Sequence, residues 1–532
     1  MCGICGVVDA VNVDLADCLA PMLKRLEHRG PDNEGVLKMD YCAFGHRRLA
    51  IIDLSERGHQ PMLSADGQVM VVFNGEIYNH KELRSILEGK GFEFRSRTDT
   101  EVLLHGHCHW GDELVHHLQG MFAFAIWDAS RRRLLAARDP LGKKPFAWFY
   151  DGGRMLFASE ITALVDGLSQ RPEINLGAVE AFLRYRYVPG NVSVYKGVQK
   201  LPPGHLLIFE PERNAPPAIA SYWAPQYRAD KRLETGAALE LLDTLLVEAV
   251  ERRMESDVPL AALLSGGLDS SLIVAIAAKK LGARWKTIHA SFTADREGES
   301  YYANLVAQVC QTEHEEIEIS PKHADRLPEV LSCFSEPYAD DSALPSYYVY
   351  AALKKHATVA ISGDGGDELF AGYLHARGFY LRDVYGRLPF LAWGATGLGR
   401  AFPGYRTHRL LRHAVSLGHY LGLSGDRAFA LTRSTAWNRD ARELLCGQAK
   451  TDPYLERAFI AADGQSDFEK MIIADISTTL PDAYLLKVDR SSMANSVEVR
   501  CPLLDGRLLQ AVQTVPRNVL MSGGQPKALQ KT

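Results

Sequence analysis

The sequence opens with MCGICGVVDA at residues 1–10, an apolar run that begins directly behind a cysteine. Short apolar runs bounded by glycine and aspartate are typical of buried β-strands. If Met1 is removed, Cys2 carries a thiol and a free α-amine, so that a nucleophile and a base stand together at the head of a strand. The competing interpretation takes Cys2 and Cys5 as a C-x-x-C pair for zinc or redox chemistry, although the chain holds no second C-x-x-C.

Similar short runs continue to about Ala163. VMVVFNG, MFAFAIWD, RLLAARD and MLFASE are rich in β-formers and separated by glycine, aspartate and proline turns, with helical stretches such as KELRSILEGKG between some of them. This alternation predicts an α+β layered domain over residues 2–163. The stretch that follows is rich in proline, glycine and tyrosine, so we expect residues 164–233 to be a connecting segment wrapped on a neighbouring surface.

From about Glu234 the pattern changes. LELLDTLLVEAVERRM has the period of an amphipathic helix, and VPLAALL, WKTIHASF, EEIEI and TVAIS are strand-like runs that alternate with further helices. Strands that alternate with helices favour an α/β fold with a doubly wound parallel sheet. We therefore predict such a domain over residues 234–532, mostly helical beyond about Gly372.

Composition excludes several classes of protein. The 532 residues carry a formal net charge of −5, which argues against a surface that neutralises nucleic-acid phosphates. Nine irregularly spaced cysteines are typical of a reduced chain rather than a disulfide framework. No signal peptide is visible, and no apolar run is long enough to cross a membrane. We expect a cytoplasmic protein without a nucleic-acid or membrane partner.

Two glycine-rich loops carry the features of a phosphate site. Residues 260–271 read as a strand, then SGGLDS, then the start of a helix, so that backbone N–H groups and a helix N-terminus face an anion. The Walker pattern would need a G-K-[ST] ending, which is missing here. ISGDGGDELFAGY follows another predicted strand, and its acids are unexpected beside a polyanion unless a metal intervenes. Asp269 and Asp367 are natural Mg²⁺ ligands.

Four ordered motifs in the first part carry a family resemblance. HRGPDNEG, FGHRRLAIIDLS, FNGEIYNHKELR and RTDTEVLL begin at residues 28, 44, 73 and 97. Together with Cys2 they resemble the class II glutamine amidotransferases, whose N-terminal-nucleophile fold is an αββα layered sandwich. The resemblance implies that Cys2 is the nucleophile and that Asn74 and Gly75 form the oxyanion hole. It implies a glutamine site built from Arg48, Leu49, Ala50, Ile51, Ile52, Asn74, Gly75, Glu76 and Asp99.

SGGLDSS resembles the pyrophosphate loop of the ATP pyrophosphatases. A glutaminase followed by this loop, with ARDPLGKKPFAW, SEPYADDSALPSYYV and LLKVDRSSMANSVEVRCPLLD, is similar to the glutamine-hydrolysing asparagine synthetase family. In that family an acyl-adenylate forms on the acceptor, and ammonia that arrives through an internal tunnel displaces AMP. The resemblance implies that Asp364 acts in forming this intermediate. It implies an ATP site built from Leu264, Ser265, Gly266, Gly267, Asp269, Ser270, Ser271, Ala290, Ser362 and Gly363.

The resemblance implies a carbon–nitrogen ligase that uses glutamine, ATP and Mg²⁺ to amidate aspartate, and a homodimer is plausible for the family. An alternative is amidation of another carboxylate, such as an envelope polysaccharide or a natural-product precursor. Glu498, Arg500 and Asp505 are expected to form structural ion pairs near the substrate pocket.

The end of the sequence departs from the family pattern. In the family, a loop with a charge-neutralising lysine follows the R-x-P-x-L-D motif, and Lys527 and Lys531 come too early to match it. If the synthetase domain is truncated there, we expect glutaminase activity to survive better than synthesis. A glutaminase or scaffold with impaired synthesis is therefore a further alternative.

Overall fold

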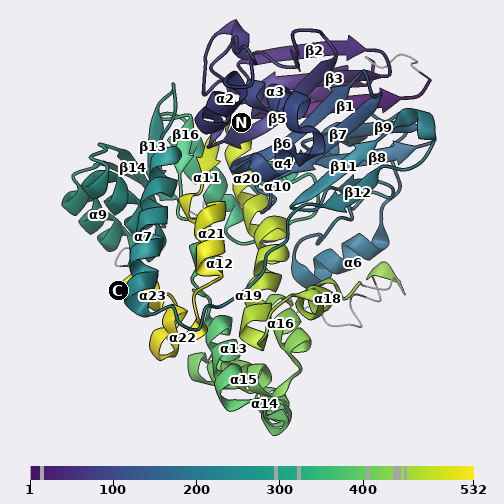
Figure 1. Cartoon of the computed structure of the whole chain (residues 1–532). Coiled ribbons are helices and arrows are strands. Elements are labelled where there is room, and N and C mark those ends of the chain that lie inside the picture. The colour runs from purple at the N-terminus through teal and green to yellow at the C-terminus, as the bar shows by residue number, and fades with distance from the viewer. Residues whose placement is uncertain are drawn as a thin grey trace.

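The computed structural model describes residues 2–11, 17–292, 298–319, 325–402, 408–434, 442, 445–447 and 452–532. Three β-sheets organise the described chain (Figure 1). Two six-stranded antiparallel sheets lie in the N-terminal part, and a five-stranded parallel sheet lies in the C-terminal part. Helices dominate the region below the parallel sheet in the view of Figure 1.

The first N-terminal sheet has the strand order β10-β8-β9-β1-β3-β2, and the second has the order β12-β11-β7-β6-β5-β4. Alternating small and bulky apolar residues on the facing sides of the two sheets, such as Val8, Phe44, Val72 and Ala125, form the core between them. The strands of this part are β1 (Gly3–Asp9), β2 (Asn33–Met39), β3 (Cys42–Arg48), β4 (Met62–Leu63), β5 (Val69–Ile77), β6 (Gly120–Asp128), β7 (Arg133–Arg138), β8 (Ala147–Asp151) and β9 (Arg154–Ala158).

Helices cover the outer face of each N-terminal sheet. α1 (Leu19–Arg25) and α5 (Ile161–Asp166) pack on the first sheet, while α2 (His80–Glu88) and α3 (Thr100–Trp110) pack on the second. A short α4 (Leu114–His117) follows α3. The order helix, sheet, sheet, helix is the αββα sandwich expected from the motifs, and this part of the fold prediction is confirmed.

The segment predicted to connect the two parts contributes strands of its own. β10 (Gln199–Lys200) pairs with β8, and β11 (His205–Phe209) pairs with β7 on one side and β12 (Ala218–Ser221) on the other. These strands extend the edges of the N-terminal sheets because β7 and β8 offer unpaired backbone groups there. Residues 199–221 are therefore continuous with the sandwich, and α6 (Leu176–Tyr185) precedes them.

The parallel sheet has the order β15-β14-β13-β16-β17, with β13 in the centre. α11 and α20 pack on one face through Tyr350, Leu353 and Val488, whereas α7, α8 and α9 pack on the other. This is the doubly wound arrangement that the alternating pattern predicts. The elements are α7 (Thr235–Arg252), β13 (Leu260–Leu263), α8 (Leu268–Ala275), β14 (Lys286–Phe292), α9 (Glu299–Cys310), β15 (Glu313–Ile319), α10 (Leu327–Ser332), α11 (Ala343–Leu353), β16 (Val359–Ile361), α12 (Gly366–Leu369) and β17 (Glu498–Arg500).

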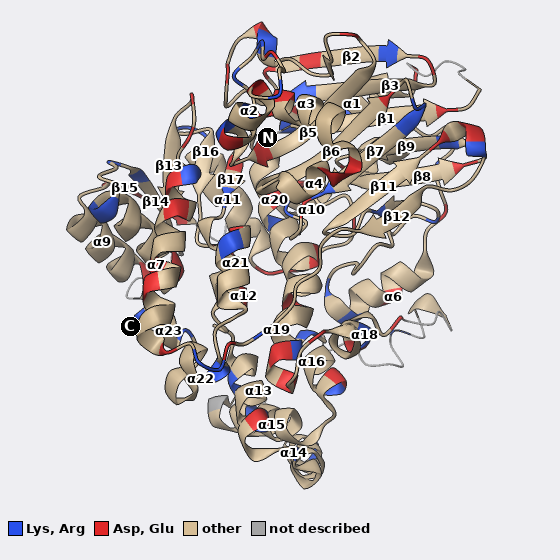
Figure 2. Ribbon diagram, in the orientation of Figure 1, with Lys and Arg blue, Asp and Glu red and all other residues tan. Residues whose placement is uncertain are grey.

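In the described part of the chain beyond α12, the regular structure is helical apart from β17, as the sequence predicts. Its helices are α13 (Leu374–Tyr385), α14 (Pro389–Ala401), α15 (Arg409–Gly422), α16 (Gly425–Arg433), α18 (Tyr454–Ala461), α19 (Asp467–Ser477), α20 (Leu486–Met493), α21 (Gly506–Val512), α22 (Arg517–Leu520) and α23 (Ala528–Lys531). Acidic and basic residues are interspersed over both parts (Figure 2). Within the described ranges, no helix combines the length and the apolar character needed to span a bilayer.

Candidate active sites of the two halves

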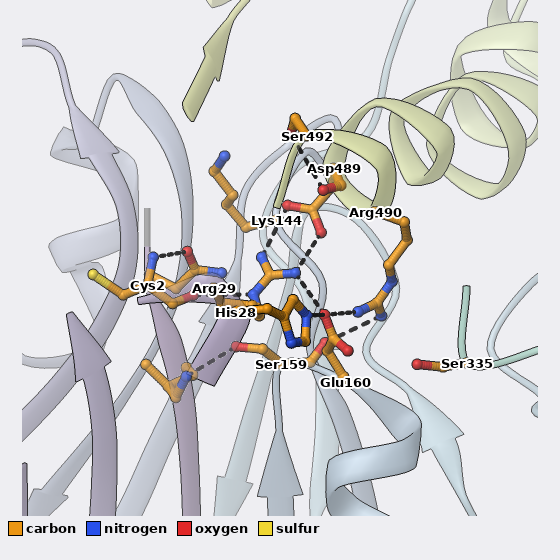
Figure 3. Close-up of polar contacts among 12 residues, drawn as sticks. Cys2, His28, Arg29, Lys144, Ser159, Glu160, Ser335, Asp489, Arg490 and Ser492 are labelled. Carbon is orange, nitrogen blue, oxygen red and sulfur yellow. Dashed lines mark hydrogen bonds and ion pairs between the residues drawn. The ribbon is translucent and has the colours of Figure 1, made fainter. Parts of the chain in front are cut away.

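Cys2 lies at the head of β1, against the strand that carries Asn74. The backbone N of Cys2 donates to Oδ1 of Asn74 over 3.0 Å, and both residues are buried (Figure 3). Nδ2 of Asn74 is also buried and has no hydrogen-bond partner among the described residues. A buried donor without a partner is costly unless a ligand uses it, so this amide is suited to a developing oxyanion. Burial raises the pKa of the Cys2 thiol.

Gly75 is required by the close passage of a neighbouring strand. A β-carbon at this position would lie 2.1 Å from the carbonyl oxygen of Met121 in β6, so no other residue fits without moving the strand. Glycine at position 75 therefore lets β5 lie close to β6 at the edge of the cavity. This local geometry matches the pairing of Asn74 and Gly75 expected from the FNGE motif.

A cavity beside Cys2 gathers most of the predicted glutamine site. Arg48, Leu49, Ile51, Ile52, Gly75, Glu76 and Asp99 line it together with Cys2. Asn74 reaches Cys2 directly, whereas Ala50 is outside the lining and its backbone N donates to Asp32 over 2.9 Å. Gln60, Thr98 and Thr100 also line the cavity and were missed by the sequence reasoning, because uncharged polar residues in loops give no separate signal.

The charged groups of this cavity divide into two sets. The guanidinium of Arg48 donates to the carbonyl oxygens of Ile52, Asp53 and Ser55, which fix it and leave some of its N–H groups for a ligand. Burial holds the pKa of Glu76 well above its usual value and also raises the pKa of Asp99. A cationic partner such as an α-ammonium group would stabilise the ionised form of both carboxyl groups.

The geometry rejects the C-x-x-C interpretation of the N-terminus. Cys5 is fully buried inside β1, and its Sγ faces the carbonyl oxygen of Gly45 at 3.7 Å. Side chains three positions apart along an extended chain point to opposite faces. Cys2 and Cys5 therefore cannot bind one metal ion or form a disulfide with each other.

A second cavity of about 450 Å³ lies at the carboxyl ends of β13 and β16. Six of the predicted ATP residues line it, namely Ser265, Gly267, Asp269, Ser270, Ser362 and Gly363. Four others are outside the lining, namely Leu264, Gly266, Ser271 and Ala290. A β-carbon at position 363 would lie 2.7 Å from the backbone N of Ser270, so glycine lets the two loops approach closely. Ligand sites in open parallel sheets lie at this edge.

Acidic side chains from the second loop border the same cavity. Asp364 accepts a hydrogen bond from the Ser362 hydroxyl over 2.7 Å, which fixes its carboxylate at the cavity wall. Glu368 accepts a hydrogen bond from Tyr373 over 2.5 Å, and burial raises the pKa of Glu368 to about 7. The cavity therefore offers a fixed carboxylate close to the SGGLDS loop.

Lys527 lies between the two predicted metal ligands. Its Nζ is 2.6 Å from Oδ2 of Asp269 and 2.6 Å from Oδ1 of Asp367. Burial disfavours the ammonium, but the two carboxylates outweigh it and raise the pKa of Lys527. The two carboxylates are ligands of the kind that a hard cation prefers, and the ammonium group of Lys527 occupies the point between them. The final segment therefore places a lysine at this site, although sequence spacing alone assigned Lys527 no role there.

Comparisons with known proteins agree with this two-site arrangement. A family model described as a glutamine amidotransferase domain matches residues 1–223, and one described as asparagine synthase matches residues 241–532. The chain belongs to the asparagine synthase family.

Individual members of the asparagine synthase family match along nearly the whole chain. The asparagine synthetase [glutamine-hydrolyzing] 1 of Bacillus subtilis is 33% identical, over 99% of this chain and 83% of that protein. A putative asparagine synthetase [glutamine-hydrolyzing] 2 of Methanocaldococcus jannaschii is 34% identical, over 93% of this chain and 98% of that protein. The resemblance drawn from the motifs is confirmed, and with it the enzyme class, a carbon–nitrogen ligase with glutamine as nitrogen donor.

In this member of the asparagine synthase family, a buried ion network joins the two halves behind Cys2 (Figure 3). Arg29 donates to the carbonyl oxygen of Cys2 over 3.2 Å, to Glu160 over 2.9 Å, and to both carboxylate oxygens of Asp489 over 2.8 and 3.0 Å. Arg490 pairs with Glu160 over 2.5 Å. The start of β1, behind Cys2, is thus tied to α20 in the C-terminal half. Arg29 lies in the HRGPDNEG motif, but no local signal identifies its partner.

The SVEVRCPLLD motif also reaches the cavity beside Cys2. Glu498 lines that cavity, and Arg500 pairs with Glu498 over 2.6 Å and with Glu76 over 3.1 Å. Asp505 instead pairs with Arg253 over 3.0 Å and caps α21. All three residues form ion pairs, as the sequence predicts, but Glu498 also belongs to the cavity of the other half.

Proposed function

We propose that the protein synthesises asparagine from aspartate, with ammonia released from glutamine and with energy from the cleavage of ATP to AMP and pyrophosphate. The observation that carries the proposal is the pairing of Cys2 with Asn74, whose amide nitrogen has no partner within the described ranges, in a chain that also holds the SGGLDSS cavity. Membership of the asparagine synthase family supports the assignment. Asp364 and the phosphate loop then share one cavity.

The glutaminase half acts through Cys2 after removal of Met1. The α-amine of Cys2 takes the thiol proton, and the thiolate attacks the side-chain carboxamide of glutamine. Asn74 Nδ2 and the backbone N–H of Gly75 donate to the oxyanion, ammonia leaves, and water hydrolyses the resulting thioester to glutamate. Arg48 holds the α-carboxylate of glutamine, while Glu76 and Asp99 hold its α-ammonium group.

The synthetase half activates the acceptor carboxylate. A free carboxylate is a poor electrophile, so its oxygen first attacks the α-phosphorus of ATP and pyrophosphate leaves. Ammonia from the first site then attacks the acyl-adenylate, and AMP leaves. Of the predicted ATP residues, Ser265, Gly267 and Ser270 line the cavity where they can bind the pyrophosphate, and Ser362 and Gly363 line it where they can bind the nucleoside part. Asp269 and Asp367 would hold Mg²⁺, which supplies positive charge to the phosphate oxygens.

Product analysis tests the proposal directly. The purified chain is incubated with aspartate, ATP, Mg²⁺ and glutamine, and asparagine, AMP, pyrophosphate and glutamate are measured. We expect asparagine and AMP in equal amounts. Cys2→Ala should abolish synthesis from glutamine and retain synthesis from ammonium chloride. Equal loss of both activities would contradict a division of labour between two sites.

The acceptor is tested separately with a panel of carboxylic acids. AMP release is measured with aspartate, glutamate, a β-amino acid and a sugar carboxylate under the same conditions. We expect aspartate to give the highest kcat/KM. Turnover of another acid with no response to aspartate would keep the two-site chemistry and overturn the assignment of the substrate.

A further inference from the structure

Lys143 and Cys501 meet at the boundary between the two halves of the chain. Lys143 lies in the segment between β7 and β8, and Cys501 directly follows β17. Nζ of Lys143 is 3.3 Å from Sγ of Cys501, and each residue is only 4% exposed. The two side chains therefore face each other inside the protein. Neither lines the cavity beside Cys2 or the SGGLDSS cavity.

The ammonium group of Lys143 has a sulfur atom as its partner. Lysine is rarely buried unless its charge is paired. In the described part of the chain, the hydrogen bond of Nζ goes to Cys501, and no carboxylate lies within ion-pair distance. Asp139 instead accepts from the backbone N of Lys143 over 2.9 Å. An ammonium group stabilises a thiolate beside it, and the thiolate is the form of cysteine that oxidants attack.

A small oxidant has room beside this pair. A third cavity, of about 300 Å³, lies between the two halves, and both Lys143 and Cys501 line it. Met121 and Asp139 line it from the N-terminal half, and Leu509 lines it from α21. A water molecule takes about 30 Å³ and hydrogen peroxide little more, so this cavity is large enough to admit the oxidant.

We propose that Cys501 and Lys143 are a redox modification site, at which hydrogen peroxide forms a sulfenamide bond that joins the two halves. The thiolate of Cys501 attacks one oxygen of the peroxide, the O–O bond breaks, and a sulfenic acid and hydroxide form. The hydroxide takes a proton from the ammonium group of Lys143 and becomes water. This inference goes beyond the proposed function, because the reaction needs neither glutamine nor ATP.

The second step forms the bond between sulfur and nitrogen. The amine of Lys143 attacks the sulfur of the sulfenic acid, and the S–O bond breaks. The departing oxygen leaves with one N–H proton as a second water molecule. Sulfur is thus oxidised by two electrons, peroxide is reduced to water, and the protein loses two hydrogen atoms.

The link would form next to a loop of the SGGLDSS cavity. Sγ of Cys501 lies 3.4 Å from Oγ of Ser362, and the Ser362 hydroxyl donates to Asp364 over 2.7 Å. A bond to Lys143 draws the sulfur away from this hydroxyl. Because Asp364 borders the cavity, we expect the oxidised protein to synthesise the amide more slowly.

The test is peptide mapping of the full-length chain after treatment with hydrogen peroxide. Remaining thiols are blocked with iodoacetamide, the protein is digested, and cross-linked peptides are identified by tandem mass spectrometry. We expect one peptide pair joined through Cys501 and Lys143, lighter by two hydrogen atoms than the separate peptides. Dithiothreitol should separate the pair again. This readout needs no enzymatic activity, so it stands apart from the test of the proposed function.

Two variants show which groups form the link. Lys143→Arg keeps the positive charge and removes the primary amine, so the cross-link should disappear. Dimedone, which labels sulfenic acids, should then label Cys501 more strongly than in the wild type. Cys108→Ser is the matched control, because Cys108 is an exposed free thiol. The link should form in this control as in the wild type.

Synthesis from ammonium chloride gives a second readout, which does not depend on the state of Cys2. This readout rests on the proposed function. Peroxide should lower the wild-type rate in proportion to the linked fraction, and dithiothreitol should restore it. Cys501→Ser has no sulfur to oxidise at this position and should keep the rate that it shows before treatment.

Two results would overturn the inference. One is the absence of the Cys501–Lys143 peptide pair in the peroxide-treated wild type. The other is an equal yield of cross-linked Cys501 in the wild type and in Lys143→Arg. A link that retains an oxygen atom would overturn the S–N bond as its product, and unchanged synthesis in the linked protein would overturn the effect on the SGGLDSS cavity. If Lys143→Arg does not fold, the wild-type map decides alone.

Discussion

Replacement of Arg29 by methionine should destabilise the whole chain strongly. Arg29 is fully buried and holds both oxygens of Asp489, one oxygen of Glu160 and the carbonyl of Cys2. Arg29 lowers the pKa of Asp489 although burial opposes ionisation, so the carboxylate is charged and needs its partner. Loss of one partner of a buried pair costs about 3–5 kcal/mol. For domains of this size the thermal midpoint should fall by about 6–20 °C.

The assay is differential scanning calorimetry of wild type, Arg29→Met, Asp489→Leu and the double variant. Glu160 keeps Arg490 and His28 as partners, so removal of both Arg29 and Asp489 takes away the carboxylate that depends on Arg29 and costs the buried Lys144 only the attraction of Asp489. The double variant should therefore be more stable than Arg29→Met. Arg25→Met is the control, because Arg25 pairs with Asp166 at the surface and exposed pairs contribute about 0–1 kcal/mol.

Glutamine hydrolysis gives an independent check of the same network. The Arg29 contact with the carbonyl of Cys2 fixes the start of β1, so Arg29→Met should lower kcat for glutamine hydrolysis as well as stability. A midpoint within about 2 °C of wild type, or a double variant destabilised by the sum of the two single changes, would refute the reasoning that the charges depend on each other.

Three further results are expected. Asn74→Ala should lower kcat for glutamine hydrolysis by about 10²–10³ and spare synthesis from ammonium, as measured by glutamate and AMP release; a loss below ten-fold would remove Asn74 from the oxyanion hole. Lys527→Met should lower AMP formation by about 10² and leave glutaminase activity intact, whereas Lys531→Met, at an exposed position, should change neither; equal behaviour of the two variants would contradict a role for Lys527 at the phosphate loop. Burial raises the pKa of Glu368 in the folded protein from 4.5 to about 7. Because the unfolded chain ionises more easily, the free energy of unfolding should fall by about 2.5 kcal/mol between pH 5 and pH 8. Glu368→Gln should flatten the pH dependence of the thermal midpoint over this range, and a slope equal to that of wild type would show that the carboxyl does not titrate there.

Short contiguous stretches of the sequence are sufficient to locate residues of both cavities. Cys2 stands at the head of an apolar run, and SGGLDS stands between a strand and a helix, so each can be read within about twelve residues. The helix predicted from KELRSILEGKG is observed as α2, which ends at Glu88, and Gly91 then takes a positive φ of 92° that glycine adopts easily. Local periodicity therefore predicts the elements and the residues at their ends.

Contacts between distant segments have no such signal. β10 has two residues and β12 is exposed throughout, so neither shows the alternation of a half-buried strand, and both exist only because an edge is available. Arg29 and Asp489 are separated by 460 positions, and a lone charged residue in a sequence is most often solvated. Glu498 is recognised as part of an ion pair, but its place in the lining of the cavity beside Cys2 depends on contacts between the two halves.

Strand β17 also limits how such an enzyme can be recombined. Its backbone completes the parallel sheet, while its Glu498 side chain lines a cavity in the sandwich that begins the chain. A chimera that takes the amidotransferase from one relative and the synthetase from another therefore also changes the contact between the two halves. Residues 498–500 have to come from the same parent as the amidotransferase. A crossover near residue 230 therefore needs two more, one before this strand and one after it.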